Sequence, residues 1–110
     1  MPIANCVISP SCPDGQGDLI AQWSRASRQS ADHMTVNLIK AHQQGQPYAV
    51  VATLYLPSIW SSSAIIRLQE GLALALTQYY AIAASDVIVL TQILDSGRVV
   101  EDAESVFWGL

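Results

Sequence analysis

The amino-acid sequence predicts an α+β domain in which two β-α-β units form a four-stranded mixed sheet with two helices on one face. Three observations lead to this fold class: the order of elements repeats, a short turn joins the repeats, and the strands are apolar on both sides. The units span roughly residues 2–41 and 48–94, followed by a tail over 95–110. We expect residues 1–110 to form a single domain. A ferredoxin-like monomer or dimer is the structural alternative.

The first unit reads as strand, helix, strand. Residues 2–8 are rich in Ile, Val and Cys, which favours a strand, and the segment SPSCPDGQG then has the composition of a loop. A helix follows, with Asp18 as a candidate N-cap, and HMTVNLIKA over residues 33–41 predicts a second strand. The apolar residues of the helix have helical spacing: Leu19, Ile20, Trp23 and Ala26.

The second unit repeats this order after the turn QQGQP. The run YAVVATLYL over residues 48–56 is typical of a buried strand, and SDVIVLTQI over 85–93 predicts the last strand. Between them, a helix is expected from about Ala64 to Tyr80, with the preceding serines as N-cap candidates. Its predicted core stripe consists of Ile65, Leu68, Leu72, Ala75 or Leu76, and Tyr79.

The connections determine how these strands pair. A crossover helix between two strands makes each unit a parallel pair with a right-handed connection, and the short turn sets the second unit antiparallel to the first. Both helices then cover one face of the sheet. Because the strands are apolar on both sides, the uncovered face is expected to meet another subunit, and a homotrimer is one closed arrangement.

Composition limits the function classes. Just over half of the residues (51%) are hydrophobic, 13% are charged, and the formal net charge is −4. The five Lys and Arg residues form no basic cluster, so no nucleic acid partner is expected. Cys6 and Cys12 have neither the number of a disulfide framework nor the spacing of a zinc site, and no metal or cofactor is implied. The absence of a signal-like or membrane-spanning segment predicts a cytoplasmic protein without a membrane partner.

Two stretches and the Met-Pro start carry a resemblance to a known family. The opening PIANCVIS is similar to the first strand of the tautomerase superfamily, and AIAASDVIVL is similar to the exit of its second helix. The superfamily includes macrophage migration inhibitory factor, 5-carboxymethyl-2-hydroxymuconate isomerase, 4-oxalocrotonate tautomerase and malonate semialdehyde decarboxylase. The resemblance covers almost the whole chain. It implies a homotrimer and a small carbonyl or 2-oxo acid substrate.

The resemblance assigns Pro2 the role of a general base that moves a proton between keto and enol forms. A free α-amine titrates near pH ~8, and burial lowers this pKa because the cation is desolvated, so such a base is suited to neutral pH. This role requires removal of Met1, since a proline nitrogen within a peptide bond has no basicity. Two alternatives stay open: a tautomerase-like trimer without this catalysis, acting as a binding or structural module, and a decarboxylase or hydratase of the same superfamily.

Five further residues are candidates for substrate binding, and each has a structural alternative. Asp32 lies in the region of an aspartate of the decarboxylase subgroup, or caps the entry to the second strand. Asn37 lines the site or forms a hydrogen bond at a subunit interface. Tyr55 and Leu56 close the third strand, which ends near Pro2 in the antiparallel half, or pack in the core. Trp108 reaches a neighbouring site or packs at an interface.

The cationic residues match the superfamily poorly. Lys40 lies about 23 Å along the second strand from the level of Pro2, so it is excluded from the site of its own subunit. Arg25 and Arg28 fall on the polar side of the first helix. The segment after the third strand reads PSIWS where the decarboxylase subgroup has Arg-Pro-Arg. A substrate carboxylate would therefore be held by Arg67, Arg98 or a neighbouring subunit.

Overall fold

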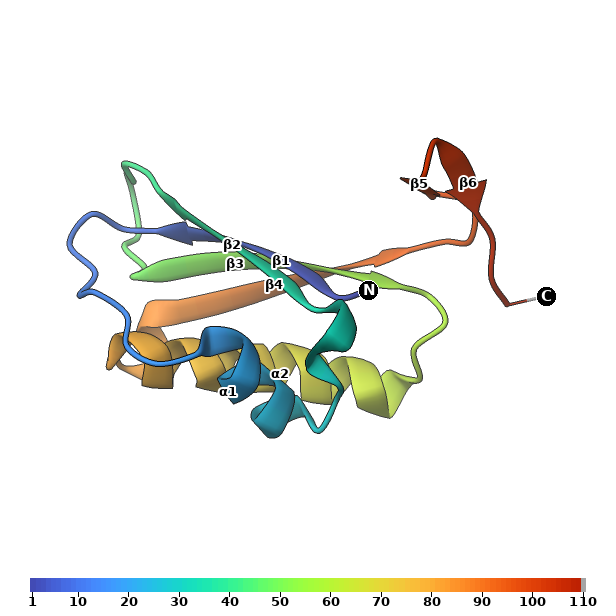
Figure 1. Cartoon of the computed structure of the whole chain (residues 1–110). Coiled ribbons are helices and arrows are strands. Elements are labelled where there is room, and N and C mark those ends of the chain that lie inside the picture. Colours follow the sequence, from blue (N-terminus) through green and yellow to red (C-terminus); the bar gives the residue numbers. More distant parts are fainter. Residues whose placement is uncertain (110) are drawn as a thin grey trace.

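The computed structural model describes residues 1–109 (Figure 1). Both predicted units form, with each boundary within a few residues of its expected place. In chain order the elements are β1 (Ile3–Ile8), α1 (Leu19–Ser27), the 3-10 turn η1 (Ala31–His33), β2 (Thr35–Lys40), β3 (Val50–Pro57), α2 (Ser62–Tyr80), the 3-10 turn η2 (Ala84–Asp86), β4 (Val87–Leu94), β5 (Val99–Glu101) and β6 (Glu104–Val106).

Side-chain caps fix where both helices begin. Asp18 accepts a hydrogen bond from the backbone N–H of Ala21 (3.1 Å), which confirms the predicted N-cap of α1. Ser61 accepts one from Ala64 (3.2 Å) and starts α2 two residues earlier than expected. Because the N-cap satisfies backbone donors of the first turn, these short polar residues set the register of each helix.

The four-stranded sheet has the order β2-β1-β3-β4. β1 pairs with β2 in parallel and β3 with β4 in parallel, while the two central strands β1 and β3 are antiparallel. Figure 1 shows α1 and α2 side by side beneath the same face of the sheet. The predicted α+β fold class and its mixed sheet are confirmed.

The sheet has a local two-fold relation between its halves. In the antiparallel register Ile8 is level with Val50, and continuing that register by one residue beyond Ile3 makes Pro2 level with Leu56. A two-fold rotation therefore superimposes the first β-α-β unit on the second. In this superposition Pro2 corresponds to Val50, and η1 corresponds to η2. The sheet has two topologically equivalent ends, which we call the Pro2 end and the Val50 end.

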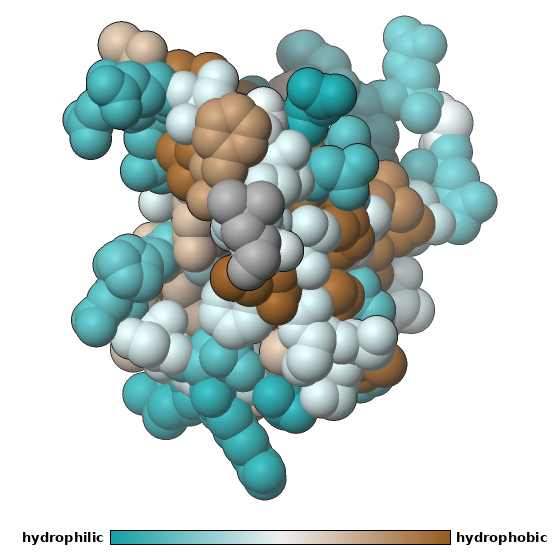
Figure 2. Space-filling model, turned by 90° about the vertical axis from the view of Figure 1, so that its right-hand side faces the viewer, coloured by the Kyte–Doolittle hydropathy of each residue, from teal (hydrophilic) through white to brown (hydrophobic). Residues whose placement is uncertain are grey.

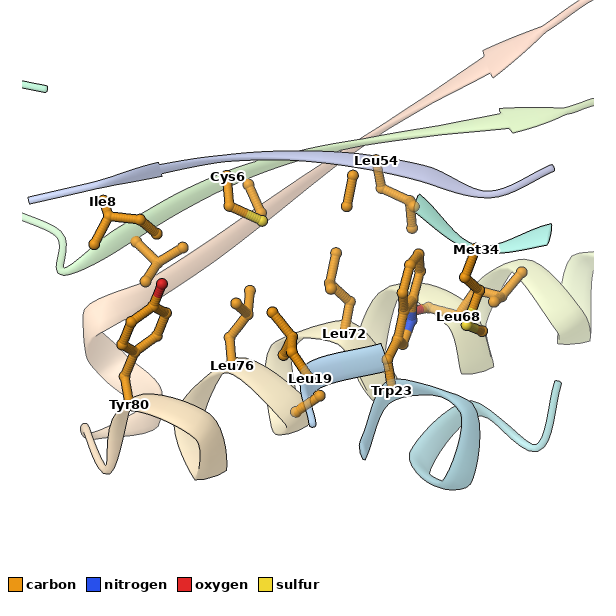
Figure 3. Close-up of a cluster of buried hydrophobic side chains, with 14 of the residues drawn as sticks. Cys6, Ile8, Leu19, Trp23, Met34, Leu54, Leu68, Leu72, Leu76 and Tyr80 are labelled. Carbon is orange, nitrogen blue, oxygen red and sulfur yellow. The ribbon is translucent and has the colours of Figure 1, made fainter. Parts of the chain in front are cut away.

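The core lies between the sheet and the helices (Figure 3). Alternate residues of β1 and β3 point into it, and Leu68, Leu72 and Leu76 of α2 meet them with no exposed surface. The Trp23 indole N–H donates to the Leu68 carbonyl (2.9 Å), which ties α1 to α2. Of the predicted core stripe of α2, Leu68, Leu72, Ala75 and Leu76 are buried, and Ile65 and Tyr79 are partly buried and pack against the core. Tyr80, which was not predicted, is buried as well.

The opposite face of the sheet carries no helix (Figure 1). Its middle row contains the polar residues Asn37, Asn5 and Thr53, while most of its other side chains are apolar. Ile39 and Leu90 are 52% and 51% exposed. Across the middle of this face Asn37 donates to the side-chain oxygen of Asn5 (2.8 Å), its partner in the parallel register. By strand alternation this open face consists of Ile3, Asn5, Val7, Thr35, Asn37, Ile39, Val51, Thr53, Tyr55, Ile88, Leu90, Gln92 and Leu94, none of which is charged.

The C-terminal tail forms a hairpin that the sequence analysis did not predict. Strands β5 and β6 pair in antiparallel register, and the turn between them places Asp102 and Ala103 at positive φ. In Figure 1 this hairpin stands away from the four-stranded sheet, beyond the end of β4. Val100 (66%) and Phe107 (68%) remain exposed on this segment, so its apolar side chains are largely uncovered within one chain.

Candidate active site

Pro2 lies buried at one end of the sheet, between two neighbouring strands. Leu56 is level with it on β3, and Met34, which immediately precedes β2, is level with it on the other side. Leu56 has no exposed surface and Met34 is 9% exposed. The ring of Pro2 faces the helices, as do the next alternate residues of β1. The immediate surroundings of the proline are therefore apolar.

The nitrogen of Pro2 is directed toward η1. The Pro2 carbonyl accepts a hydrogen bond from the Thr35 N–H (3.0 Å), and in a parallel ladder the N and O of one residue face the same neighbouring strand. Pro2 has no N–H to complete this ladder. The position facing its nitrogen belongs to the turn that contains Asp32 and His33, both of which are exposed. This confirms that Pro2 is level with the entry to the second strand.

Burial and a nearby negative charge both change the pKa of the Met1 α-amine. Burial lowers the pKa of the Met1 α-amine, because the cation loses water, and the negative charge of Glu101 in β5 opposes this effect. Glu101 therefore lies near the N-terminus although it is almost the whole chain away in sequence.

The C-terminal segment is hydrogen-bonded to the residues that follow β3 and β4 at the same end of the sheet. The Trp108 indole N–H donates to the Ser58 hydroxyl (3.0 Å), and the Trp108 backbone N–H donates to Ser96 (2.7 Å). Ser58 directly follows Pro57, the last residue of β3. Figure 2 views this end and shows apolar side chains in patches between hydrophilic ones. Trp60, two residues beyond Ser58, has a buried indole nitrogen without a hydrogen-bond partner.

The predicted site residues fall into two groups. Pro2 and Leu56 lie level on adjacent strands, Asp32 lies on the turn that the Pro2 nitrogen faces, and Trp108 is fastened at the same end. Asn37 and Tyr55 do not join them within one chain. Their side chains lie on the open face, on the other side of the sheet from the Pro2 ring.

The cationic side chains are all exposed, and one of them is far from Pro2. Lys40 is level with Ile8, at the opposite end of β1, as the sequence analysis expected. Arg25 belongs to the last turn of α1, and Arg28 ends that helix at a φ of 59°. Within residues 1–109 no group of three or more His, Cys, Asp or Glu side chains is placed to hold a metal ion.

Sequence reasoning missed several residues of this end. Met34 was assigned to a strand rather than to the Pro2 surroundings, and Glu101 and Ser58 were not considered. A shift of one residue in the pairing of β1 with β2 decides whether Met34 lies beside Pro2, and no local pattern in the sequence determines that pairing. The contact of Trp108 with Ser58 joins residues fifty positions apart, so it had no local signal at all.

Among the described residues no helix is long and apolar enough to cross a membrane. No protein-family model and no curated protein matches the chain by sequence. Its fold, however, matches solved structures closely, and these belong to the tautomerase superfamily. The chain therefore has the tautomerase-superfamily fold.

Three solved structures illustrate the match. A native fused 4-OT has a TM-score of 0.73 at 12% identity, over 94% of both chains. Macrophage migration inhibitory factor from Oncomelania hupensis has a TM-score of 0.68 at 10% identity, over 96% of this chain and 83% of its own. The protein N1, a member of the cis-3-chloroacrylic acid dehalogenase family, gives 0.65 at 10%, over 94% and 82%. Other matching fused 4-OT structures are described as symmetric and asymmetric trimers.

Proposed function

We propose that the chain is a tautomerase that interconverts keto and enol forms of a small 2-oxo acid, with Pro2 as the general base. The burial of Pro2 at the strand end, with its nitrogen directed toward η1, is the observation that carries this proposal. A secondary amine held there has a fixed ring, an apolar lining and a defined direction, which are the conditions for a positioned base.

The proposed reaction moves one proton. Once Met1 is removed, the neutral Pro2 amine takes a proton from the enol hydroxyl, and the protonated ring nitrogen returns a proton to the carbon beside the carbonyl. Burial lowers the pKa of the Met1 α-amine, and we expect it to act in the same direction on the Pro2 amine, which favours the neutral base. No cofactor is needed for this step.

We also propose that the active unit is a homotrimer. The open face is uncharged and largely apolar, and in Figure 1 no helix of residues 1–109 lies on it. Fused 4-OT structures of similar fold are trimers, which supports self-association of this chain, and the open face is the surface that we propose for it. A neighbouring subunit would then complete the site and would bring its own Asn37 and Tyr55 into a buried environment.

A second candidate function is a tautomerase-like trimer that binds or scaffolds without catalysis. The observation that favours it is the set of cations: Lys40 lies at the opposite end of β1, and the other four are exposed. A carboxylate substrate would find no buried positive partner in one chain. If Met1 is retained, Pro2 is an amide nitrogen and only this second function remains.

The test combines the mass of the intact protein with turnover of phenylpyruvate enol. We expect loss of Met1 and a kcat/KM that rises with pH through an apparent pKa below the value of about 8 of an ordinary α-amine. The direction follows from burial, since desolvation favours the neutral base. A preparation that lacks Met1 but does not ketonise the enol would contradict the tautomerase and favour the non-catalytic trimer.

A further inference from the structure

We propose that the Val50 end of the sheet holds a second, non-catalytic pocket that binds a small amine with an apolar body. This proposal is independent of the chemistry at Pro2. It rests on a hollow in the surface, on the groups that line it, and on the two-fold relation between the ends of the sheet.

The hollow lies where β1 ends and β3 begins. Its volume is about 240 Å³, enough for a small organic molecule. Segments distant in sequence surround it: the loop after β1, the three residues before β3, and the turn before β4. The lining consists of Ser9, Ser11, Cys12, Pro13, Pro47, Tyr48, Ala49, Ile82 and Asp86.

The two-fold relation makes this hollow the counterpart of the Pro2 surroundings. Since Pro2 corresponds to Val50, Ala49 corresponds to Met1, and η2 with Asp86 corresponds to η1. The backbone here is continuous, however. The Ala49 N–H donates to the Asp86 carbonyl (2.8 Å), and the Val50 nitrogen, which corresponds to the Pro2 nitrogen, belongs to a peptide bond. The pocket therefore cannot supply a basic nitrogen from the backbone, and its role is binding alone.

The polar groups of the lining select hydrogen-bonding ligands. The hydroxyls of Ser9 and Ser11 lie 3.1 Å apart, and the Tyr48 hydroxyl accepts from Gln46 (3.1 Å) and keeps its own proton to donate. Cys12 is 7% exposed, and burial raises the pKa of its thiol, so it stays uncharged. Hydroxyls that can turn to donate or accept suit a ligand with an amine or hydroxyl group.

The charge of the lining favours a cation over an anion. Asp86 is the one ionised side chain among the lining residues, and its carboxylate is exposed at the turn. Lys40 lowers the pKa of the Cys12 thiol and Asp86 raises it by a smaller amount, both effects being smaller than that of burial, but Lys40 does not line the hollow. The rings of Pro13, Pro47 and the side chain of Ile82 offer apolar walls. An ammonium near Asp86 with an apolar body against these walls fits both features.

The experiment is a titration of the full-length, isotope-labelled protein followed by NMR. Three probes share one ring and differ in charge: benzylamine, benzyl alcohol and benzoate. We expect benzylamine to shift the amide signals of Ser11, Tyr48 and Ile82 most, benzyl alcohol to shift them less, and benzoate to leave them unchanged. Equal shifts for benzylamine and benzoate, or no shifts with any probe, would overturn the proposal.

A matched pair of variants tests whether the Asp86 carboxylate is the group that attracts the amine. Asp86→Asn should weaken benzylamine binding at least 5-fold and leave benzyl alcohol unchanged, whereas Asp95→Asn, which removes an exposed carboxylate at the opposite end of β4, should change neither. If both variants weaken benzylamine binding equally, the net charge of the chain causes the loss, and the pocket is not specific for an amine. Because the experiment measures binding at the Val50 end and not turnover at Pro2, failure here leaves the proposed tautomerase unaffected.

Discussion

The two ends of the sheet have the same backbone topology but different chemical groups. At the Pro2 end a strand is preceded by a buried proline, and Trp108 of the C-terminal segment donates to Ser58, directly after β3. At the Val50 end the corresponding strand is entered from a turn, the Ala49 N–H just before the strand is bonded to the Asp86 carbonyl, and a hollow remains open. The fold supplies two equivalent places, and only one of them has a proline at the start of its strand.

Burial has opposite consequences for the titrating groups of this molecule. At the Pro2 end it lowers the pKa of an amine, whose charged form is the protonated one. In the core it raises the pKa of Cys6 and of Tyr80 to about 12 each, because their charged forms are the deprotonated ones. Figure 3 shows Tyr80 directed toward Ile8, at the Val50 end. One physical cause, the loss of water around a charged group, therefore keeps the amine neutral down to a lower pH and keeps the thiol and the phenol protonated up to a higher pH.

The largest expected effect is on catalysis at Pro2. In protein shown to lack Met1, Pro2→Ala keeps a primary amine but loses the fixed ring, and should lower kcat/KM for phenylpyruvate enol by roughly 10²–10⁴-fold. Val50→Ala, at the equivalent position, is the control. It should cost about 2 kcal/mol in the free energy of unfolding by removing buried methyl groups, and leave kcat nearly unchanged. Equal activity of Pro2→Ala and the parent would make the proline a strand-opening residue only.

An intermediate effect is expected on stability in alkali. The unfolded Cys6 thiol titrates near its ordinary value of 9.0 and the folded one near 12, so above pH 9 the unfolded chain holds fewer protons. The free energy of unfolding should therefore fall with a slope of up to about 1.4 kcal/mol per pH unit between these values. Denaturant titrations from pH 8 to 11 measure this slope.

Two variants identify the groups responsible for that slope. Cys6→Ala should be less stable at pH 8 because it leaves a cavity, yet should show a shallower fall toward pH 11. Tyr80→Phe should flatten the part of the curve above pH 10, the ordinary value of a tyrosine. A slope that is identical in the parent and both variants would show that other groups cause the alkaline loss.

The smallest effect is expected where the C-terminal segment meets the sheet. Trp108→Phe removes the donor to the exposed Ser58 hydroxyl and should lower the free energy of unfolding by under about 1 kcal/mol. It should change KM at the Pro2 end a few-fold and leave benzylamine binding at the Val50 end unchanged. Ser58→Ala provides the second arm of a double-mutant cycle. A coupling energy of zero in both stability and KM would mean that this hydrogen bond does not hold the segment in place.

The elements of the fold could be predicted because each carries its own local signal. Asp18 and the serines before α2 mark helix starts by capping, the turn QQGQP separates the two units, and the β-branched run of β3 is typical of a buried strand. The hairpin of β5 and β6 was missed because its strands are three residues each and polar at their turn. Tyr80 was missed because a periodicity read over one helix does not fix which side chains of its last turn are most deeply buried.

By itself the sequence determined the repeated β-α-β order, the proline at position 2 and the apolar, weakly charged strands, since composition and spacing are local properties. Only the tertiary structure decided what surrounds that proline. Strand register placed Leu56 and Met34 beside it, chain reversal brought Glu101 and Trp108 to the same end, and strand alternation sent Asn37 and Tyr55 to the other face. These relations join residues far apart along the chain, and a shift of one residue in a strand would invert each of them.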